Sequence, residues 1–344
     1  MANTPHNFLK NKTILVCGGC GFMGSNFIRY ILDNFPKSKI INLDSLTYAG
    51  NKANLDGVPL TRYHFVKGDI ANTALMVQLM REVDYVINFA AETHVDRSIH
   101  GGAAAFVHTN IDGVRSLMEA LRNSPWVKKM IHVSTDEVWG DMPLQSKNKF
   151  NEDSPFLPNS PYAASKAAGD LLVRSYVKTY GVPVIVSHSV NNFGPRQFPE
   201  KLIPYFTLLA MQNKVLPLYG DGKNIRDWLY VDDHARAMVA LLQKAVGGEI
   251  YAISRGEEYS NLKIAYAILN VLGKPKHLIT FIKDRPGHDR RYSVDSSKLR
   301  RLGWKPKYSI EKQLQETVMW YQENFRWLRG VLQKRNTINS HIKL

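Results

Sequence analysis

Short apolar runs alternate with helix-like patterns over the first two thirds of the chain. The run at residues 13–18, Thr-Ile-Leu-Val-Cys-Gly, predicts a buried strand, and apolar residues at helical spacing from Phe27 to Leu32 predict a helix behind it. The same signals place further strands at 39–43, 64–70 (with its turn), 84–90, 130–133 and 182–188, and long helices at 103–121 and 162–180. Strands that alternate with helices form a parallel sheet with helices on both faces, so the pattern predicts a doubly wound α/β fold.

The pattern changes after residue 192, where turn-forming residues and prolines cluster. A hairpin that bears Arg226 is expected at 219–227, a helix at 233–244, and a strand at 250–253 that rejoins the sheet edge. We therefore expect a smaller, irregular substrate-binding domain at the C-terminal side. The predicted division is a dinucleotide-binding domain (1–192 and about 229–255), the substrate-binding domain (about 193–228 and 256–333), and a basic tail (334–344) that we expect to be mobile.

Three glycines, Gly18, Gly21 and Gly24, separate the first strand from the first helix. Glycines at this spacing allow a tight turn, close approach of the backbone to a pyrophosphate, and close packing of helix on strand. A glycine-rich turn without a ligand is the alternative, which the flanking strand and helix disfavour. The turn therefore predicts a Rossmann-type dinucleotide site.

Asp44 ends the second strand, about 20 residues beyond the last glycine. A carboxylate there accepts hydrogen bonds from both ribose hydroxyls and repels a 2′-phosphate, which favours NAD over NADP. The alternative is a turn cap, supported by the following Ser45 and Thr47.

Composition places the chain among ordinary globular proteins. Its 344 residues are 44% hydrophobic and 22% charged, and no apolar run reaches the roughly 18 residues of a membrane span. The first residues lack a signal-peptide pattern, so we expect a cytoplasmic protein. Cys17 and Cys20 are the two cysteines; two ligands are too few for a metal site, and a disulfide would distort the glycine turn, so both are expected to be packing residues.

The net charge of +15 suits either nucleic acid or a small anionic substrate such as a diphosphate. Part of the excess lies in the tail, and the remainder is dispersed without a basic stripe interleaved with aromatics. We therefore expect no nucleic-acid partner and no membrane partner. A basic loop at 284–292, with a proline and a glycine at its centre, is suited to binding a diphosphate, although such a charge run is often only a solvated surface.

The candidate chemistry lies at 133–140, Val-Ser-Thr-Asp-Glu-Val-Trp-Gly, where a buried strand ends in hydroxyls and two carboxylates. Tyr162 and Lys166 follow, four residues apart and so on one face of a helix. Asp136 and Glu137 alone could be a turn pair without chemistry, but the tyrosine and lysine favour a redox and proton-transfer site. His94 and Arg97 follow the strand at 84–90, where ligands of such sheets bind.

These residues resemble the extended short-chain dehydrogenase/reductase superfamily and, more narrowly, the dTDP-glucose 4,6-dehydratases. The resemblance runs from about Lys12 to Gln333. The Asp-Glu pair after Ser134-Thr135 is its specific part, because epimerases and decarboxylases of the superfamily lack it. The matching segments are 42–51, 90–99, 134–138, 160–166, 198–204, 225–231 and 284–292.

The resemblance implies an NAD-dependent dehydration of dTDP-glucose to dTDP-4-keto-6-deoxyglucose, an early step of deoxysugar biosynthesis. Tyr162, with its pKa lowered by Lys166 and the nicotinamide charge, would take the proton from the 4-hydroxyl while hydride leaves carbon 4. Glu137 would then remove the proton from carbon 5, Asp136 would protonate the departing 6-hydroxyl, and Thr135 would hold the 4-oxygen. Two adjacent carboxyls suit this chemistry because one must be protonated and the other ionised.

The resemblance also assigns binding residues. With the glycines of the turn, the cofactor-binding set is Gly18, Gly21, Phe22, Met23, Gly24, Asp44, Ser45, Leu46, Thr47, Asp69, Ile70, Ala90, Ala91, Glu92, Thr109, Tyr162, Lys166 and Asn192. The substrate-binding set is His94, Thr135, Asn191, Lys201, Leu202, Pro217, Tyr219, Arg226, Asn261, Asp284, Arg285, His288 and Tyr292. The family implies no metal, and a homodimer through the helices near 103–121 and 160–180.

Several positions depart from the family pattern. Cysteines stand at 17 and 20, a methionine at 23, and Trp139 replaces a common tyrosine. The segments 188–190 and 255–261 also differ, which leaves the nucleotide base open. The alternatives are a dehydratase of another nucleotide sugar such as UDP-glucose, a sugar-nucleotide 4-epimerase, and a non-catalytic NAD-binding scaffold; the last usually loses the tyrosine or lysine that this chain keeps.

Overall fold

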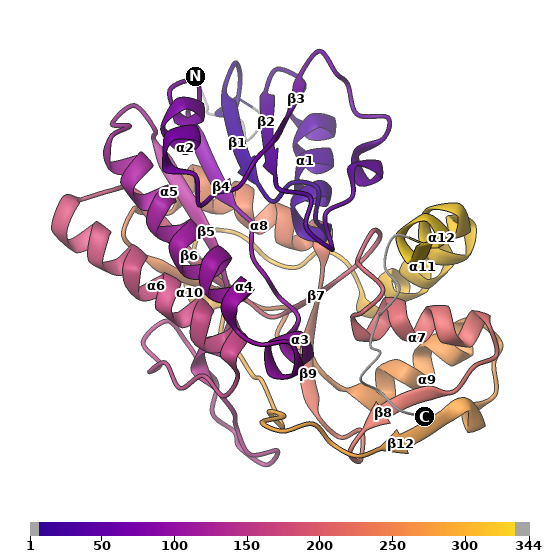
Figure 1. The fold of residues 1–344 in the computed structure, drawn as a ribbon. Coiled ribbons are helices and arrows are strands. Elements are labelled where there is room, and N and C mark those ends of the chain that lie inside the picture. Colours follow the sequence, from indigo (N-terminus) through magenta and orange to yellow (C-terminus); the bar gives the residue numbers. More distant parts are fainter. Residues whose placement is uncertain (1–6, 334–344) are drawn as a thin grey trace.

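A seven-stranded sheet forms the centre of the protein, whose computed structural model describes residues 7–333 (Figure 1). Every neighbouring pair of strands in this sheet is parallel, which confirms the predicted doubly wound α/β fold. The order across the sheet is β10 (Ile250–Ile253), β6 (Val184–Ser189), β5 (Lys129–Thr135), β4 (Tyr85–Asn88), β1 (Thr13–Cys17), β2 (Lys39–Asp44) and β3 (Tyr63–Lys67). As expected, the strand near residue 250 joins the sheet at its edge.

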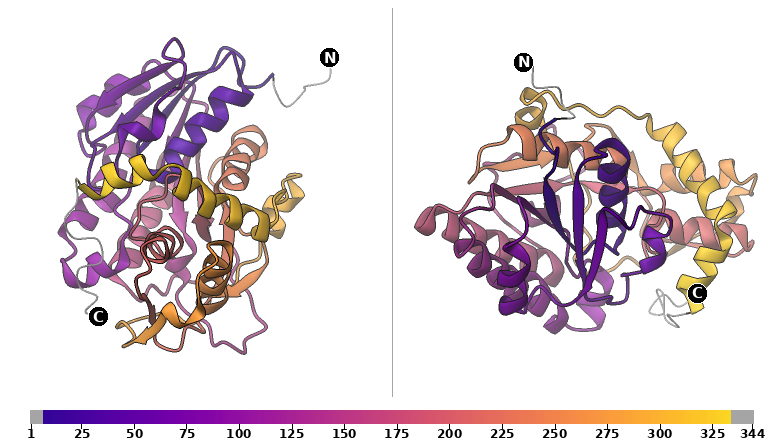
Figure 2. Two further views of the ribbon diagram at one scale, coloured as in Figure 1. Left: turned by 90° about the vertical axis from the view of Figure 1, so that its right-hand side faces the viewer. Right: turned by 90° about the horizontal axis from the view of Figure 1, so that it is seen from above.

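Helices cover both faces of the sheet (Figures 1 and 2). One face carries α1 (Phe22–Asn34) and α8 (Val231–Lys244), and the other carries α2 (Thr73–Met80), α5 (Gly113–Arg122) and α6 (Pro161–Tyr180). Because both faces are covered, the central strands are apolar throughout, as in the fully buried run Ile14-Leu15-Val16.

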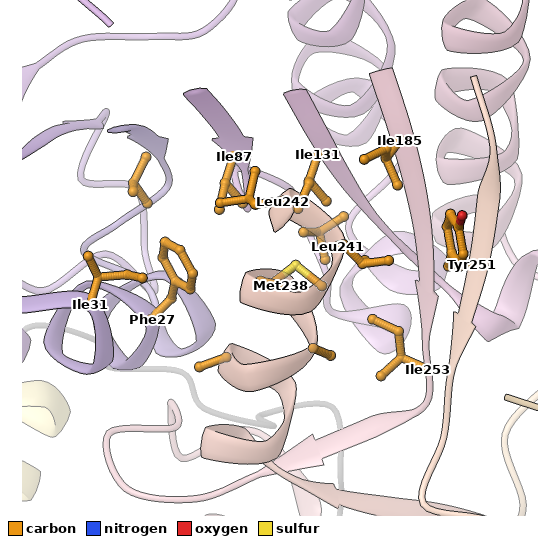
Figure 3. Close-up of a cluster of buried hydrophobic side chains, with 14 of the residues drawn as sticks. Phe27, Ile31, Ile87, Ile131, Ile185, Met238, Leu241, Leu242, Tyr251 and Ile253 are labelled. Carbon is orange, nitrogen blue, oxygen red and sulfur yellow. The ribbon is translucent and has the colours of Figure 1, made fainter. Parts of the chain in front are cut away.

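Figure 3 shows the core between the sheet and α1 and α8. Met238, Leu241 and Leu242 of α8 pack against isoleucines of the strands, and each is at most 1% exposed. Burying one such side chain contributes about 1.5–3 kcal/mol, so this layer fixes α8 and the strand ends that it supports.

The expected helix at 103–121 is interrupted by a π-helical turn. The chain forms α4 (Ala104–Val107), η2 (His108–Asp112) and then α5 in one continuous run. A single extra residue in a helix re-aims the side chains around it. Here Asn110 lies against α6, where a Cβ on Gly169 would come within 2.6 Å of the Asn110 carbonyl oxygen. Gly169 therefore allows α6 to pack closely against the π-helical turn.

The C-terminal part contains two small sheets and its own core. One sheet joins β11 (Glu258–Ser260), β9 (Ile225–Tyr230) and β7 (Asn191–Phe193), and the other joins β12 (Ile279–Ile282) and β8 (Leu216–Tyr219). The hairpin predicted at 219–227 is wrong, because β8 and β9 belong to different sheets. Instead β8 pairs with β12, and β9 lies between β11 and β7.

The helices of this part surround those sheets. Tyr321 and Trp327 belong to a cluster at the C-terminal end, and Trp327 donates a hydrogen bond to Asn54 beside α1, at 2.9 Å. The C-terminal helix thus contacts the N-terminal half of the chain, as the left view of Figure 2 shows.

The remaining elements are η1 (Lys52–Leu55), α3 (Val95–His100), η3 (Asp136–Trp139), α7 (Leu202–Met211), α9 (Asn261–Val271), η4 (Lys276–Leu278), α10 (Ser297–Arg301), α11 (Ile310–Glu323) and α12 (Phe325–Gln333).

The predicted division into two domains stays a prediction, and the tail at 334–344 lies outside the described residues. Among the helices of residues 7–333, none is long and apolar enough to cross a membrane.

Candidate active site

Three adjoining hollows lie beyond the carboxyl ends of the central strands, where the strand order reverses between β1 and β4. The first and second share the glycine-turn residues Gly18 and Gly21 in their lining, and the second and third share Glu137 and Asn191, so the three are continuous neighbours.

The glycine turn shapes the first two hollows. Gly18 has a φ of +77°, and a Cβ there would lie 2.6 Å from the backbone nitrogen of Ala90 at the end of β4. Gly21 begins α1 without a side-chain cap, so the helix N-terminus is open to an anion. These features fit the pyrophosphate of a dinucleotide.

Asp44 is held at the end of β2 by the same turn. Its carboxylate accepts hydrogen bonds from the backbone nitrogens of Cys20 (2.8 Å) and Leu46 (2.7 Å). Burial raises the pKa of this carboxyl, although both bonds oppose the shift. Each carboxylate oxygen has a second acceptor position, so ribose hydroxyls can still bind. A turn cap and a ribose ligand are therefore compatible at this residue.

Most of the predicted cofactor residues line the first hollow. They are Gly18, Gly21, Asp44, Ser45, Thr47, Asp69, Ile70, Ala90, Ala91, Glu92 and Thr109. Leu46 does not line it and contributes its backbone nitrogen to Asp44 instead. The lining fits the adenosine half of NAD.

The second hollow joins the glycine turn to the residues with candidate chemistry. Its lining includes Gly18, Gly21, Phe22, Met23, Gly24, Thr135, Asp136, Glu137, Tyr162, Asn191 and Asn192. The Oδ1 atom of Asn192 is buried and has no hydrogen-bond partner among the described residues. A buried acceptor without a partner is costly, so this atom is suited to a donor on a ligand.

Lys166 does not reach any of the hollows. Its ammonium donates to the carbonyl of Val133 at 2.9 Å, and the residue is 3% exposed. Lys166 thus lies one turn beyond Tyr162 on α6 and points to β5. The start of α6 is fixed by Pro161 as its first residue and by Ser160, whose side chain accepts a hydrogen bond from the Ala163 nitrogen.

Thr135 organises the end of β5. Its side-chain oxygen caps η3 by accepting from the Glu137 nitrogen (3.3 Å), and its hydroxyl lies 3.2 Å from Asp136 Oδ1 as a donor. The Thr135 side chain also lies close enough to Tyr162 to oppose the rise in the pKa of its phenol. Because one residue contacts all three, the strand end sets their relative positions.

The two adjacent carboxyls have different surroundings. Burial, and then the charge of Glu137, raise the pKa of Asp136 well above its ordinary range. Burial also raises the pKa of Glu137, but the cations Arg285 and Lys201 oppose that shift. Of the two, Asp136 therefore keeps a proton more readily, and Glu137 ionises more readily.

The expected lowering of the Tyr162 pKa includes the charge of bound nicotinamide and stays a prediction. In the chain by itself, burial, and then the charge of Glu137, raise the pKa of this phenol. Burial also lowers the pKa of Lys166 to about 8. The charges of the protein alone therefore do not activate this phenol, and further positive charge beside it is needed.

The third hollow lies between α3 and the C-terminal part. Its lining contains His94, Asn191, Lys201, Leu202, Pro217, Tyr219, Arg226, Asn261, Arg285 and His288 from the predicted substrate set. Asp284 and Tyr292 do not line it. Asp284 Oδ1 lies 2.6 Å from His288 Nδ1, and the Arg226 guanidinium lies over the Tyr292 ring at 4.1 Å, so both residues support a lining residue.

The basic loop at 284–292 is less available to a diphosphate than predicted. Arg285 forms an ion pair with Asp96 at 3.0 Å, Arg290 with Asp221 at 3.0 Å, and Arg291 with Glu258 at 2.7 Å. Ion pairs within the protein thus neutralise most of the positive charge of this loop. Of the three arginines, only Arg285 also lines the third hollow.

The sequence did not identify several residues that build the site. Asp96 holds Arg285 at the wall of the third hollow, and Tyr48 donates to Glu200 at 2.7 Å between the second and third hollows. Asn110 bonds both backbone groups of Glu92 and the hydroxyl of Ser165. A polar residue on a predicted helix gives no signal of such contacts.

Cys17 and Cys20 are buried thiols without a disulfide, and Cys20 Sγ accepts a hydrogen bond from the Asn42 side chain at 3.4 Å. Burial raises the pKa of Cys20 to about 12. Within residues 7–333, no group of three or more His, Cys, Asp or Glu side chains is arranged to hold a metal ion.

The sequence and the structure are similar to those of known proteins. Residues 15–317 match the family model of GDP-mannose 4,6 dehydratase. The chain is 46% identical to the low-salt glycan biosynthesis protein Agl12 of Haloferax volcanii, over 90% of this chain and 98% of that protein. It is 44% identical to dTDP-glucose 4,6-dehydratase 1 of Escherichia coli, over 92% and 95% of the two chains.

A solved structure is similar over the same length. The crystal structure of DesIV, a dTDP-glucose 4,6-dehydratase from Streptomyces venezuelae with NAD and TYD bound, matches with a TM-score of 0.88 and 45% identity. The match covers 92% of this chain and 98% of that one.

The raised pKa of Asp136 predicts that Asp136→Asn stabilises the protein, increasingly so as pH rises. A carboxyl that binds its proton more tightly in the folded state than in the unfolded state costs stability above its ordinary pKa, at up to about 1.4 kcal/mol per pH unit. Asparagine carries no charge to bury. Urea unfolding at about pH 5 and about pH 8 measures the difference.

Asp221→Asn is the control, because Arg290 lowers the pKa of Asp221 to about 2 and removal of that carboxylate should weaken folding at both pH values. Equal effects of Asp136→Asn at the two pH values would show that Asp136 is not a buried acid.

Proposed function

This chain belongs to the family of NAD-dependent nucleotide-sugar 4,6-dehydratases, within the extended short-chain dehydrogenase/reductase superfamily, and we propose that it converts dTDP-glucose to dTDP-4-keto-6-deoxyglucose. The observation that carries the proposal is the pair Asp136 and Glu137, which face the same hollow as Tyr162 and differ in their readiness to ionise. An elimination of water needs one acid and one base on the same substrate, and this pair supplies both.

NAD is the proposed cofactor, since the first two hollows form one continuous cleft around the glycine turn. Gly18 leaves space for a pyrophosphate, Asp44 for ribose hydroxyls, and Asn192 offers its unpaired acceptor at the other end. When bound, NAD would accept hydride from carbon 4 of the sugar, return it to carbon 6, and supply the positive charge that Tyr162 lacks.

Tyr162 is the proposed base for the 4-hydroxyl. Tyr162 lines the second hollow together with Thr135, and Lys166 follows one turn later on the same face of α6. The Thr135 hydroxyl, which donates to Asp136 in the free chain, would turn to donate to the 4-oxygen and hold that atom beside the phenol. A ketone at carbon 4 then makes the hydrogen on carbon 5 acidic, which is why oxidation precedes elimination.

Glu137 is the proposed base for carbon 5, and Asp136 is the proposed acid for the 6-hydroxyl. Glu137 lines both the second and the third hollow, where the sugar of a nucleotide sugar would pass. Arg285 and Lys201 favour its carboxylate form, and burial favours the acid form of Asp136. The protonation states thus match the roles without any rearrangement.

The nucleotide sugar would occupy the third hollow. Arg226 and His288 lie in its wall beside Tyr219, and these side chains suit the diphosphate and the nucleobase of such a substrate. Dehydration of a different nucleotide sugar is the second candidate, because the similar protein Agl12 is described by a role in glycan biosynthesis and not by a substrate. An epimerase would need no acid-base pair at 136 and 137. A cytoplasmic location stays a prediction from the sequence.

A substrate panel tests the function. The holoenzyme is incubated separately with dTDP-, UDP-, CDP- and GDP-glucose, and the mass of each product is measured. We expect dTDP-glucose to lose one water molecule. The product should be a 4-ketone that absorbs ultraviolet light strongly in alkali. Faster turnover of another nucleotide sugar would correct the substrate, and an unchanged product mass with all four would overturn the dehydratase assignment.

Glu137→Gln should permit oxidation of the sugar and block elimination. Reduced cofactor would then accumulate, and its absorbance after addition of dTDP-glucose measures this, while product formation should fall by about 10²–10⁴-fold. Tyr162→Phe is the control, because loss of the first base should suppress the rise in absorbance itself. Normal turnover of Glu137→Gln would refute its role.

We also propose a homodimer through the face of α4, α5 and α6. Val107, Leu171 and Tyr180 are exposed on these helices, at 44%, 55% and 47%. Apolar side chains gathered on two packed helices are typical of an association surface. Sedimentation should give a dimer for the native chain and a monomer for Leu171→Asp, with Leu60→Asp, on an exposed loop away from these helices, as the control. A native monomer would refute the proposal.

A further inference from the structure

A buried polar cluster lies behind Lys166 and has no part in the proposed chemistry. Asp170 is four residues from Lys166 on α6 and therefore on the same face, and it is 3% exposed. The strand β5 binds both residues at consecutive positions. The Val133 carbonyl accepts from Lys166, and the Ser134 hydroxyl donates to Asp170 Oδ2 at 2.7 Å.

Histidines from two strands also face Asp170. His188 on β6 lies next to Ser134 in register, and its Nε2 is 2.9 Å from Asp170 Oδ2. His132 on β5 places its Nε2 3.4 Å from Asp170 Oδ1. All three of these side chains are buried.

The hydrogen bonds fix which nitrogen of His132 carries the proton. The Asn88 side-chain oxygen accepts from the Ala90 nitrogen at 3.1 Å, so its amide nitrogen faces His132 Nδ1 at 3.2 Å and donates to it. The proton of neutral His132 is then on Nε2, toward Asp170. Asp170 Oδ2 thus has Ser134 and His188 as hydrogen-bond partners, while Oδ1 lies near His132 Nε2 without a hydrogen bond among the described residues.

We propose that Asp170 is a positioning residue, whose carboxylate, fixed by Ser134 and His188, keeps the ammonium of Lys166 charged and in place behind Tyr162. Asp170 acts through its charge across one helical turn, and the Val133 carbonyl supplies the direct contact. Only the catalytic consequence of this proposal rests on the proposed function.

The charges around the cluster agree with this role. Burial lowers the pKa of Lys166 to about 8, and the charge of Asp170 opposes that shift. Burial alone would raise the pKa of Asp170, but the hydrogen bond from His188 and the charges of neighbouring groups outweigh it and lower that pKa. The other titratable groups that face the cluster or its tyrosine are His132 and His188 on the strands, Tyr162 on α6, and Asp136 and Glu137 in η3.

The cluster explains why a tryptophan stands at position 139, where a tyrosine is common in the family. Its ring meets the His188 ring edge-on, with the centroids 4.7 Å apart, and stacks on Phe150 at 5.8 Å. Positions 139 and 188 both depart from the family pattern, and they are in contact. Trp139 therefore holds the histidine that holds Asp170.

Asp170→Asn in the NAD-bound protein tests the proposal. Asparagine keeps the size and removes the charge, so Lys166 should lose its proton at lower pH. NMR of lysine labelled at the ε carbon reads this titration directly, with Lys166→Met to assign the signal. A tenfold rise in the acid dissociation constant would lower the charged fraction at about pH 8 from about a half to about a tenth, a loss of about fivefold.

Two controls separate this effect from damage to the fold. Val173→Ala, on the same helix and equally buried, should lower the melting temperature and leave the Lys166 titration unchanged. If Asp170→Asn does not fold, Lys166→Met gives the reciprocal measurement, because coupling acts equally on both partners. The carboxyl signal of Asp170 should then titrate at higher pH than in the native protein. An unchanged titration of Lys166 in Asp170→Asn, or of Asp170 in Lys166→Met, overturns the proposal.

The same variant has an expected activity. With the nucleotide sugar that the native protein turns over, Asp170→Asn should lower kcat at about pH 8 by about fivefold, move the alkaline limb of the pH profile to lower pH, and leave KM nearly unchanged. Native protein without dehydratase activity would refute the proposed function and leave the Lys166 titration as a separate result. Active protein with an unshifted alkaline limb in the variant would refute the positioning role.

Discussion

The proposed chemistry depends on two adjacent carboxyl groups at the end of a strand, Asp136 buried and Glu137 half-buried. Asp136 and Glu137 are next to each other in the chain, and desolvation raises the pKa of both. Such groups cost stability unless the surrounding fold over-determines their position. The seven-stranded sheet, the cap by Thr135 and the helix that carries Tyr162 provide that rigid support.

The difference between the two carboxyls comes from the other half of the chain. Lys201 and Arg285 belong to the C-terminal part, and their charges favour the ionised form of Glu137. Asp96, from the sheet side, holds Arg285 in place. The contact between the two parts of the chain therefore sets the protonation of the site as well as enclosing a ligand.

Much of the fold and the site followed from the sequence, because local signals specify them. Strand periodicity and the glycine turn predicted the parallel sheet, and the spacing of Tyr162 and Lys166 predicted their shared helix face. The hairpin at 219–227 failed because strand pairing is decided by distant segments such as β12. The use of Arg290 within an ion pair, and the raised pKa of Tyr162, depend on tertiary neighbours and burial that no local pattern contains.

The two cysteines of the glycine turn have a consequence for the conditions in which the protein can work. Thiolates, not thiols, react with peroxides and disulfides. Burial raises the pKa of Cys17 and Cys20, so neither is ionised at neutral pH. Both thiols of the glycine turn are thus poor nucleophiles toward oxidants at neutral pH, so the turn carries sulfur without the reactivity of a thiolate.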